Sequence, residues 1–263
     1  MKEQLTIIKV GGKVLEQPES LATFVEQFLS ISGKKVLVHG GGVMADQVLK
    51  ERGITPRMIN GRRITDEQTL DTVVMVYGGL VNKQLVARLN ANGISAAGLT
   101  GADGLTVESV KRPSEPVDYG YAGDVVKVHT GLLETLLSGD IVPVVAPISA
   151  STEGQLLNTN ADTMATEIAV ALADRFDVTL LYGFEITGVM ADINDPDSLI
   201  TRLDRKMYAD LLAADKIHSG MVPKLDNAFR AAPHTARTLI AHYGKIGTLI
   251  NSGTGLFTEI ADK

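Results

Sequence analysis

The feature that most constrains the fold is an alternation, along almost the whole chain, between short apolar segments and segments with helical periodicity. The apolar segments have the length of strands and lie at residues 6–10, 35–39, 94–98, 141–145, 178–182 and 238–241. The helical segments lie at residues 21–30, 43–52, 66–91, 131–138, 161–175 and 224–232, and the third of them either continues or breaks at Gly78 and Gly79. Apolar strands joined by helices predict a parallel sheet covered on both faces, so the fold class is α/β.

One stretch, between residues 104 and 130, departs from this alternation. Two short runs there, 105–110 and 125–128, are separated by Pro113, Pro116 and Gly120. Alternating runs bounded by proline and glycine are typical of a β-hairpin, so we predict a hairpin insertion. No linker composition marks a domain boundary, and a junction between two lobes is expected only near residues 174–177.

Charge and composition narrow the classes of function. The chain has 263 residues with 25 basic and 31 acidic side chains, and its net charge of −6 argues against general nucleic-acid binding. No apolar run is long enough to span a membrane, and the absence of cysteine excludes disulfides and cysteine-bound zinc. The first strand begins too early to leave room for a signal peptide, so we expect a cytoplasmic protein.

Each of the first two predicted strands ends in a glycine-rich turn. Gly11 and Gly12 follow the first strand, and Gly40, Gly41 and Gly42 follow the second. Ligands of parallel sheets bind beyond the carboxyl ends of the strands, and glycines let the backbone approach them closely. Each loop by itself could be a tight turn, but two after consecutive strands favour a cradle for a phosphoryl group.

Two lysines occupy positions that are unfavourable for a cation without a partner. Lys9 lies at the end of an apolar strand, where a buried ammonium is costly unless it is paired. Lys224 follows Pro223 at a predicted helix start, where a cation opposes the helix dipole. An anion bound beside them would explain both positions. Without such an anion, the Lys9 side chain could reach solvent at the rim of the sheet, and Lys224 could simply be exposed.

Two further segments carry polar side chains suited to a ligand. Asn158, Asn160 and Asp162 precede or open a helix; they could cap that helix, or bind a polar substrate and hold the lysines. The Arg62-Arg63 pair could bind a carboxylate by a two-pronged bond or lie in a solvated turn. The sequence contains neither a P-loop motif nor a nucleophile elbow. Its histidines are not spaced as metal ligands usually are, so no metal ligand is predicted.

Taken together and in order, these motifs resemble the amino acid kinase family over essentially the whole chain. The matching segments are Ile8-Lys9-Val10-Gly11-Gly12, His39-Gly40-Gly41-Gly42, Asn60-Gly61-Arg62-Arg63-Ile64-Thr65, Asn82-Lys83, Gly154-Gln155-Leu156-Leu157-Asn158-Thr159-Asn160-Ala161-Asp162 and Gly220-Met221-Val222-Pro223-Lys224. The resemblance implies a three-layer αβα sandwich with a mainly parallel sheet. Within this single domain it implies an acyl-amino-acid lobe at residues 1–174 and a nucleotide lobe at residues 175–263.

The activity that the resemblance implies is phosphorylation of the γ-carboxylate of N-acetyl-L-glutamate by ATP with Mg²⁺, a step of arginine biosynthesis. N-succinyl-L-glutamate is an alternative acceptor, and a non-catalytic ligand sensor with the same fold is a rival. The chain begins at the first strand, without the N-terminal helix of arginine-inhibited hexameric members, so we expect a homodimer. Neither nucleic acid nor a membrane is expected as a partner.

The resemblance also implies roles for individual residues. Lys9 and Lys224 would stabilise the phosphoryl group in flight, and Asp162 would orient them. The substrate would be bound by Gly41, Gly42, Arg63, Asn158 and Asn160. The nucleotide would be bound by Gly11, Gly12, Glu185, Gly188, Val189, Lys216 and His218, and Glu185 stands where the family usually has an aspartate.

Overall fold

A mainly parallel sheet forms the centre of the computed structural model, which describes residues 2–59, 61–192, 195, 197–218 and 220–262. The strands lie in the order β14 (Arg202–Leu203), β16 (Phe257–Ile260), β15 (Arg237–His242), β11 (Phe176–Phe184), β1 (Glu3–Val10), β2 (Lys34–His39), β8 (Val142–Ala146) and β5 (Ala96–Thr100). Within this sheet, only β15 and β16 pair antiparallel. All six predicted strands are confirmed, and β14 and β16 were not predicted.

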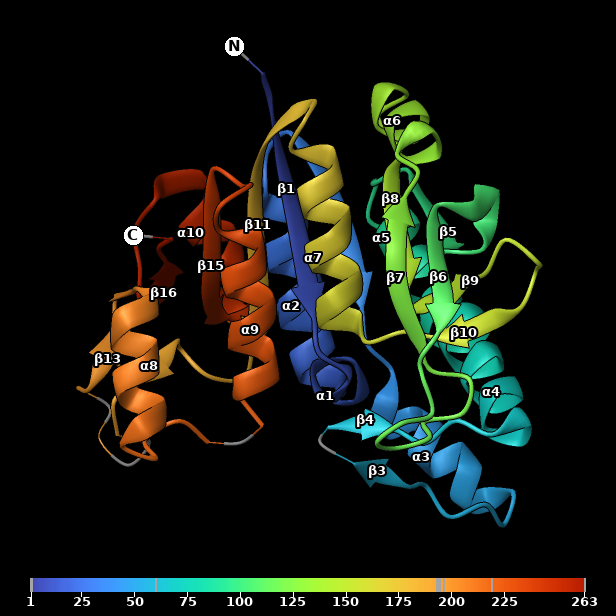
Figure 1. Cartoon of the computed structure of the whole chain (residues 1–263). Helices are drawn as coiled ribbons and strands as arrows, with labels where there is room; N and C mark the ends of the chain where they lie inside the picture. The colour runs from blue at the N-terminus through green and yellow to red at the C-terminus, as the bar shows by residue number, and fades with distance from the viewer. Residues whose placement is uncertain (1, 60, 193–194, 196, 219, 263) are drawn as a thin grey trace.

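Helices cover both faces of this sheet, as the α/β prediction requires. Successive side chains of a strand point to opposite faces, and in β1 Leu5 and Ile7 enter one hydrophobic core while Ile8 and Val10 enter the other. The first core includes residues of α6 (Gly131–Ser138), α7 (Ala161–Leu172), α8 (Arg205–Ala213) and α9 (Val222–Ala231). The second includes residues of α1 (Gly12–Glu16), α2 (Pro18–Ser30), α3 (Gly42–Glu51), α4 (Glu67–Val73), α5 (Asn82–Ala91) and α10 (Ile246–Ser252). Figure 1 shows α7 on one side of β1 and α2 on the other, which confirms three layers.

The direction in which the sheet grows reverses at β1. From β1 the chain continues to β2, β5 and β8 on one side, and it then crosses to β11, β15 and β16 on the other. Loops that leave the carboxyl ends of neighbouring strands separate at such a reversal, and the crevice between them is the usual ligand site of an open α/β sheet. A ligand site is therefore expected among the loops after β1, β2 and β11.

The predicted hairpin is present and belongs to a second sheet. The strands β6 (Val107–Lys111) and β7 (Gly123–Val128) pair antiparallel, with a register shift between Glu108 and Ser109. The unpredicted β9 (Ile148–Ala150) and β10 (Leu156–Asn158) extend this sheet to four strands. Two short ribbons were also unpredicted: β3 (Met58–Ile59) with β4 (Arg62–Arg63), and β12 (Val189–Met190) with β13 (Leu199–Ile200).

The long helical segment of residues 66–91 continues through its glycine pair. It begins with α4, whose N-cap Asp66 accepts a hydrogen bond from the Thr69 amide at 2.8 Å. A π-helix (Val74–Val81) then contains Gly78 and Gly79, and α5 follows directly. The wider π turn accommodates the glycines without a break. None of the described helices has the length and apolarity needed to cross a bilayer.

His39, the last residue of β2, is fully buried beside the carboxyl end of β1. Its Nδ1 lies 2.8 Å from the carbonyl oxygen of Gly40, and its Nε2 lies 3.1 Å from Nδ2 of Asn82. A neutral ring with the proton on Nδ1 satisfies both contacts, because the amide of Asn82 then donates to the bare Nε2. Burial lowers the pKa of His39 to about 4.

This environment predicts acid sensitivity of the fold. The unfolded chain binds a proton at His39 near pH 6.5 and the folded chain only near pH 4, so this contribution to stability is present above pH 6.5 and is lost as the pH falls to 4. We expect the loss to be about 3 kcal/mol in the free energy of unfolding. Urea unfolding between pH 7 and pH 4 should show a flatter dependence for His39→Asn, which keeps a donor towards Gly40. Equal pH dependence in the two proteins would contradict this assignment.

Candidate active site

Two lysines that are far apart in sequence meet on one carboxylate. Lys9 comes from the end of β1, Lys224 from the first turn of α9, and Asp162 from the first turn of α7. The Lys9 Nζ lies 2.7 Å from Oδ1 of Asp162, and the Lys224 Nζ lies 3.6 Å from Oδ2. The expectation that the two ammonium groups converge is confirmed. Lys9 therefore has a partner inside the protein and does not reach solvent at the rim.

Burial makes this cluster electrostatically strong. The side chains of Lys9 and Asp162 are each 7% exposed, and that of Lys224 is 31% exposed. Burial lowers the pKa of Lys9, and Lys224 acts in the same direction, whereas Asp162 opposes them. Burial alone would raise the pKa of Asp162, but the two lysines hold it below its usual range. With all three groups ionised, the cluster carries one net positive charge, which favours an anion at its open side.

The ring of Phe184, the last residue of β11, contributes to the same cluster. The Nζ atoms of Lys9 and Lys224 lie 5.3 Å and 5.2 Å from its centroid. The face of an aromatic ring attracts cations, so this ring supports both ammonium groups in addition to the carboxylate.

The two predicted glycine loops touch each other beside Lys9. The Gly40 amide donates to the carbonyl of Val10 at 3.0 Å. A Cβ atom on Gly12 would lie 3.2 Å from the Gly42 nitrogen and 3.3 Å from the Gly41 nitrogen. The loops are therefore more than separate tight turns, because their backbones are packed at a distance that leaves little room for a side chain.

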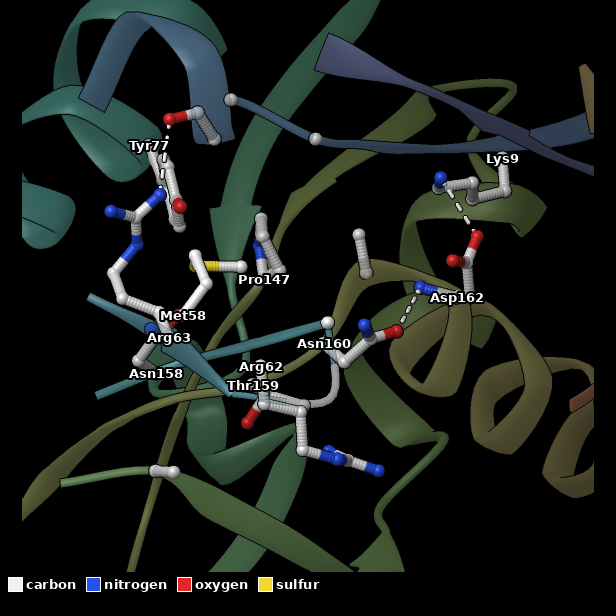
Figure 2. A pocket seen from close by; sticks show the side chains of 16 residues that line it. Lys9, Met58, Arg62, Arg63, Tyr77, Pro147, Asn158, Thr159, Asn160 and Asp162 are labelled. Atoms are coloured by element: carbon white, nitrogen blue, oxygen red, sulfur yellow. Dashed lines mark hydrogen bonds and ion pairs between the residues drawn. The ribbon is translucent and has the colours of Figure 1, made fainter. Parts of the chain in front are cut away.

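Next to this cluster lies a cavity of about 190 Å³. Its lining includes every predicted substrate residue and two of the three predicted catalytic residues, namely Lys9, Gly41, Gly42, Arg63, Asn158, Asn160 and Asp162. Figure 2 shows Lys9 and Asp162 on one side of it, Arg63 and Tyr77 on the other, and Asn160 between them. The third predicted catalytic residue, Lys224, does not line this cavity but forms an ion pair with Asp162, which does.

Arg63 is held in a defined position in the cavity wall. It is buried, forms an ion pair with Asp46 through Nη1, and donates from Nη2 to the carbonyl of Gly42 at 3.1 Å. A guanidinium has five N–H donors, so these contacts leave donors for a ligand. The interpretation of Arg63 as a solvated turn residue is therefore wrong. Asn60 of the same motif lies outside the described residues.

The two asparagines serve the fold and line the cavity as well. Asn160 caps α7, since its Oδ1 accepts from the amides of Asp162 at 2.8 Å and Thr163 at 3.1 Å. Its Nδ2 is not used by this cap. Asn158 donates to Oγ1 of Thr65 at 3.0 Å, which fixes the orientation of its amide. Capping and ligand binding, posed as alternatives in the sequence, are thus compatible.

Tyr77 is a cavity residue that the sequence analysis did not identify. It is buried on the π-helix, and a Cβ atom on Gly41 would lie 2.7 Å from its ring carbon Cδ1. Its hydroxyl oxygen would lie 4.0 Å from a Cβ atom on Gly42. The sequence gives no local signal for it, because the π-helix that carries it is visible only in the structure. Arg62, the other member of the predicted arginine pair, lines the cavity too, and Met58, Ala122, Pro147 and Thr159 are lining residues for which no role was predicted.

A second cavity, of about 470 Å³, gathers five of the predicted nucleotide residues. They are Glu185, Gly188, Val189, Lys216 and His218, and Ile186, Met190, Ile217 and Met221 line it with them. Two of its lining residues adjoin the lysine cluster in the chain, since Glu185 follows Phe184 directly and Met221 lies one turn before Lys224. Gly11 and Gly12 line neither cavity. They belong to the loop that packs against Gly40–Gly42.

Acidic and histidine side chains do not form a metal site in the described part of the chain. No group of three or more of them is arranged to hold a metal ion there.

Comparison with known proteins agrees with this geometry. The model of the amino acid kinase family matches residues 4–242. The chain belongs to the amino acid kinase family. Acetylglutamate kinase from Phocaeicola vulgatus is 49% identical over 255 residues, which are 97% of this chain and 98% of that protein. Acetylglutamate kinase from Cytophaga hutchinsonii is 46% identical over 260 residues, 98% of each chain.

A solved structure supports the fold of this amino acid kinase. Carbamate kinase from Giardia lamblia, in complex with AMP-PNP, matches with a TM-score of 0.71 over 99% of each chain. The sequences are only 14% identical, so this likeness concerns the fold alone.

The contact between Gly41 and Tyr77 predicts a local packing cost. Gly41→Ala would place a methyl group against the Tyr77 ring, and we expect a loss of about 1–3 kcal/mol in the free energy of unfolding. Gly131→Ala is the matched control, because nothing lies within 4 Å of its added Cβ, and it should be neutral to within about 0.5 kcal/mol. Chemical unfolding of both variants measures the difference. A Gly41 variant as stable as the control would show that the ring does not press on this loop.

Proposed function

We propose that this amino acid kinase transfers the γ-phosphoryl group of ATP to the γ-carboxylate of an N-acyl-L-glutamate. N-acetyl-L-glutamate is the acceptor that the names of the relatives indicate. The observation that carries the proposal is the convergence of Lys9 and Lys224 on Asp162 at a polar cavity, while residues next to Phe184 and Lys224 in the chain line the cavity that holds the predicted nucleotide residues. An acceptor in one and a nucleotide in the other would face each other across the two ammonium groups.

The chemistry requires charge stabilisation more than proton transfer. A carboxylate is already ionised at neutral pH, so its oxygen can attack the γ-phosphorus without a general base. The new bond joins the carboxylate oxygen to phosphorus, the bond from phosphorus to the β-phosphate oxygen breaks, and ADP leaves with that electron pair. Lys9 and Lys224 neutralise the charge on the moving phosphoryl group, and Asp162 keeps them oriented.

The remaining predicted residues hold the two reactants in line. Arg63 is suited to the α-carboxylate of the acceptor, because a guanidinium binds a carboxylate through two parallel bonds. Gly41, Gly42, Asn158 and Asn160 offer backbone and amide groups to the rest of it. The glycine loops with Gly11 and Gly12 face the phosphates, and the nucleotide brings its Mg²⁺ as part of the substrate.

Three features of the whole molecule complete the proposal. Residues 1–174 form the acyl-amino-acid lobe and residues 175–263 the nucleotide lobe, consistent with the residues that line each cavity. The protein acts in the cytoplasm, where ATP is available to a kinase. It works as a homodimer, and the exposed Met75 and Leu80 on the π-helix are the apolar residues that a partner subunit would cover.

A coupled ADP assay tests this function. ADP should form only when ATP and an N-acylglutamate are both present, and hydroxylamine should convert the acyl phosphate to a hydroxamate. Glutamate, aspartate and carbamate serve as controls for other acceptors. Binding of ATP and an N-acylglutamate without ADP formation would support the rival function of a ligand sensor, and a preference for a control acceptor would reassign the substrate.

Lys9→Ala and Lys224→Ala are each expected to lower turnover by about 100- to 1000-fold, the usual effect of removing one group that stabilises transition-state charge. Lys206→Ala is the matched control, because this lysine is exposed on α8 and pairs only with Asp210 at 2.8 Å among the described residues. It should keep its turnover. Thermal unfolding checks that all three proteins fold. Turnover near the wild-type value in either active-site variant would remove that lysine from the mechanism.

A further inference from the structure

A hydroxyl group outside both cavities holds one wall of the second cavity in place. That wall is the turn after β11, in which Gly188 and Val189 line the cavity of about 470 Å³. The amide of Val189, the first residue of β12, donates to Oγ1 of Thr258 at 2.7 Å. Thr258 belongs to β16 and lines neither this cavity nor the acceptor cavity. A predicted nucleotide residue is therefore fixed by a side chain that the proposed function does not use.

The same hydroxyl also binds the second strand of the β12–β13 ribbon. Thr258 is fully buried, and its Oγ1 donates to the carbonyl of Ile200 at 2.6 Å. Ile200 on β13 is the register partner of Val189 on β12. A hydroxyl has one proton to donate and lone pairs that accept, so a single group satisfies an N–H of β12 and a C=O of β13. Thr258 thus joins the ribbon to the central sheet, where β13 lies beside β16 (Figure 1).

The turn lies so close to Thr258 that only glycine fits at position 188. A Cβ atom on Gly188 would lie 2.6 Å from Oγ1 of Thr258 and 3.0 Å from its backbone nitrogen. It would also lie 2.7 Å from Cδ1 of Leu199 on β13. These separations are shorter than van der Waals contact, so a side chain at position 188 would push the turn away from β16.

Loss of the hydroxyl would leave two polar groups without their partner. Val189 is 3% exposed, so water has little access to its amide in place of Oγ1 of Thr258. A buried donor without an acceptor is unfavourable, and the turn would have to move to satisfy it. Such a movement displaces Gly188 and Val189 in the wall of the cavity. The hydroxyl therefore controls the shape of a site that it does not touch.

We propose that Thr258 is a positioning residue for the nucleotide, because its hydroxyl fixes the turn of Gly188 and Val189 before ATP binds. This inference rests on the proposed function, which assigns the nucleotide to this cavity. A turn that is already ordered does not have to be ordered at the expense of binding energy, so the hydroxyl raises the affinity for ATP. The acceptor cavity is lined by other segments of the chain, so the affinity for the acceptor does not depend on Thr258.

Two variants of Thr258 test this role in the intact enzyme. Thr258→Val removes the hydroxyl and keeps the shape of the side chain, and Thr258→Ser keeps the hydroxyl. Thr258→Val should raise KM for ATP by about tenfold, while kcat and KM for N-acetyl-L-glutamate change by less than about threefold. Thr258→Ser should bring KM for ATP back to within about threefold of the wild-type value. Titration calorimetry with ADP measures the same loss of affinity without turnover.

Thr238→Val is the matched control for lost stability. Thr238 is a buried threonine on β15 of the same sheet, its Oγ1 lies 2.8 Å from Oγ1 of Thr235, and it lines neither cavity. This variant should melt at a lower temperature and bind ADP with the wild-type affinity. An equal loss of ADP affinity in both valine variants, or an unchanged affinity in Thr258→Val, would show that the Thr258 hydroxyl serves only the fold.

Hydrogen exchange in the wild type tests the inference even where Thr258→Val fails to fold. The Val189 amide should be protected before ADP is added and should gain little protection from it. An amide that exchanges freely until ADP binds would overturn the role of Thr258. A wild type that binds ADP but forms none from ATP and an acceptor would instead refute the kinase reaction and leave the Thr258 comparison standing. A wild type that does not bind ADP would overturn both.

Discussion

One buried carboxylate holds two ammonium groups that come from opposite ends of the chain. Asp162 pairs with Lys9 at 2.7 Å and with Lys224 at 3.6 Å. Removing one member of a buried ion pair leaves an uncompensated charge, which typically costs about 3–5 kcal/mol, so each member depends on the others. The cluster has a surplus positive charge, and its Lys9 and Asp162 line the cavity of about 190 Å³. This surplus positive charge can stabilise an incoming phosphoryl group.

The fold explains why these three residues can meet. The sheet reverses its direction of growth at β1, and β1 therefore carries Lys9 to the crevice between the loops of both halves. Asn160 caps α7 and so places Asp162 in its first turn, facing the strand end. The start of α9 supplies Lys224 from the other side, at a position where the helix dipole disfavours a cation. Asp162 compensates this unfavourable local position, and in the proposed reaction the phosphates of the nucleotide add to that compensation.

The regular parts of this architecture can be predicted from the sequence, and the irregular ones cannot. The six central strands were predictable because a strand covered on both faces must be apolar throughout, and Asn160 was predictable because capping is a local property. The π-helix was not, since no local pattern in the sequence marks the change from α to π hydrogen bonding. The edge strand β14 has only two residues, too few for a periodic pattern.

The Arg62-Arg63 pair shows this limit most clearly. The motif indicates a guanidinium in the substrate site, but the residue numbers alone do not say which of the two arginines faces which part of the cavity. The structure shows that Arg63 forms an ion pair with Asp46, and that Arg62, its neighbour on the paired strand β4, leaves the strand on the opposite face.

A crystal structure with MgADP, aluminium fluoride and N-acetyl- or N-succinyl-L-glutamate tests the central claim most directly. The planar fluoride would mimic the phosphoryl group in flight between the two reactants. We expect the Nζ atoms of Lys9 and Lys224 both to lie within about 3 Å of its fluorine atoms, the range of a charge-assisted hydrogen bond, with Asp162 still bridging the lysines. A fluoride that is bound away from one of these lysines, with that lysine directed to solvent, would contradict the claim.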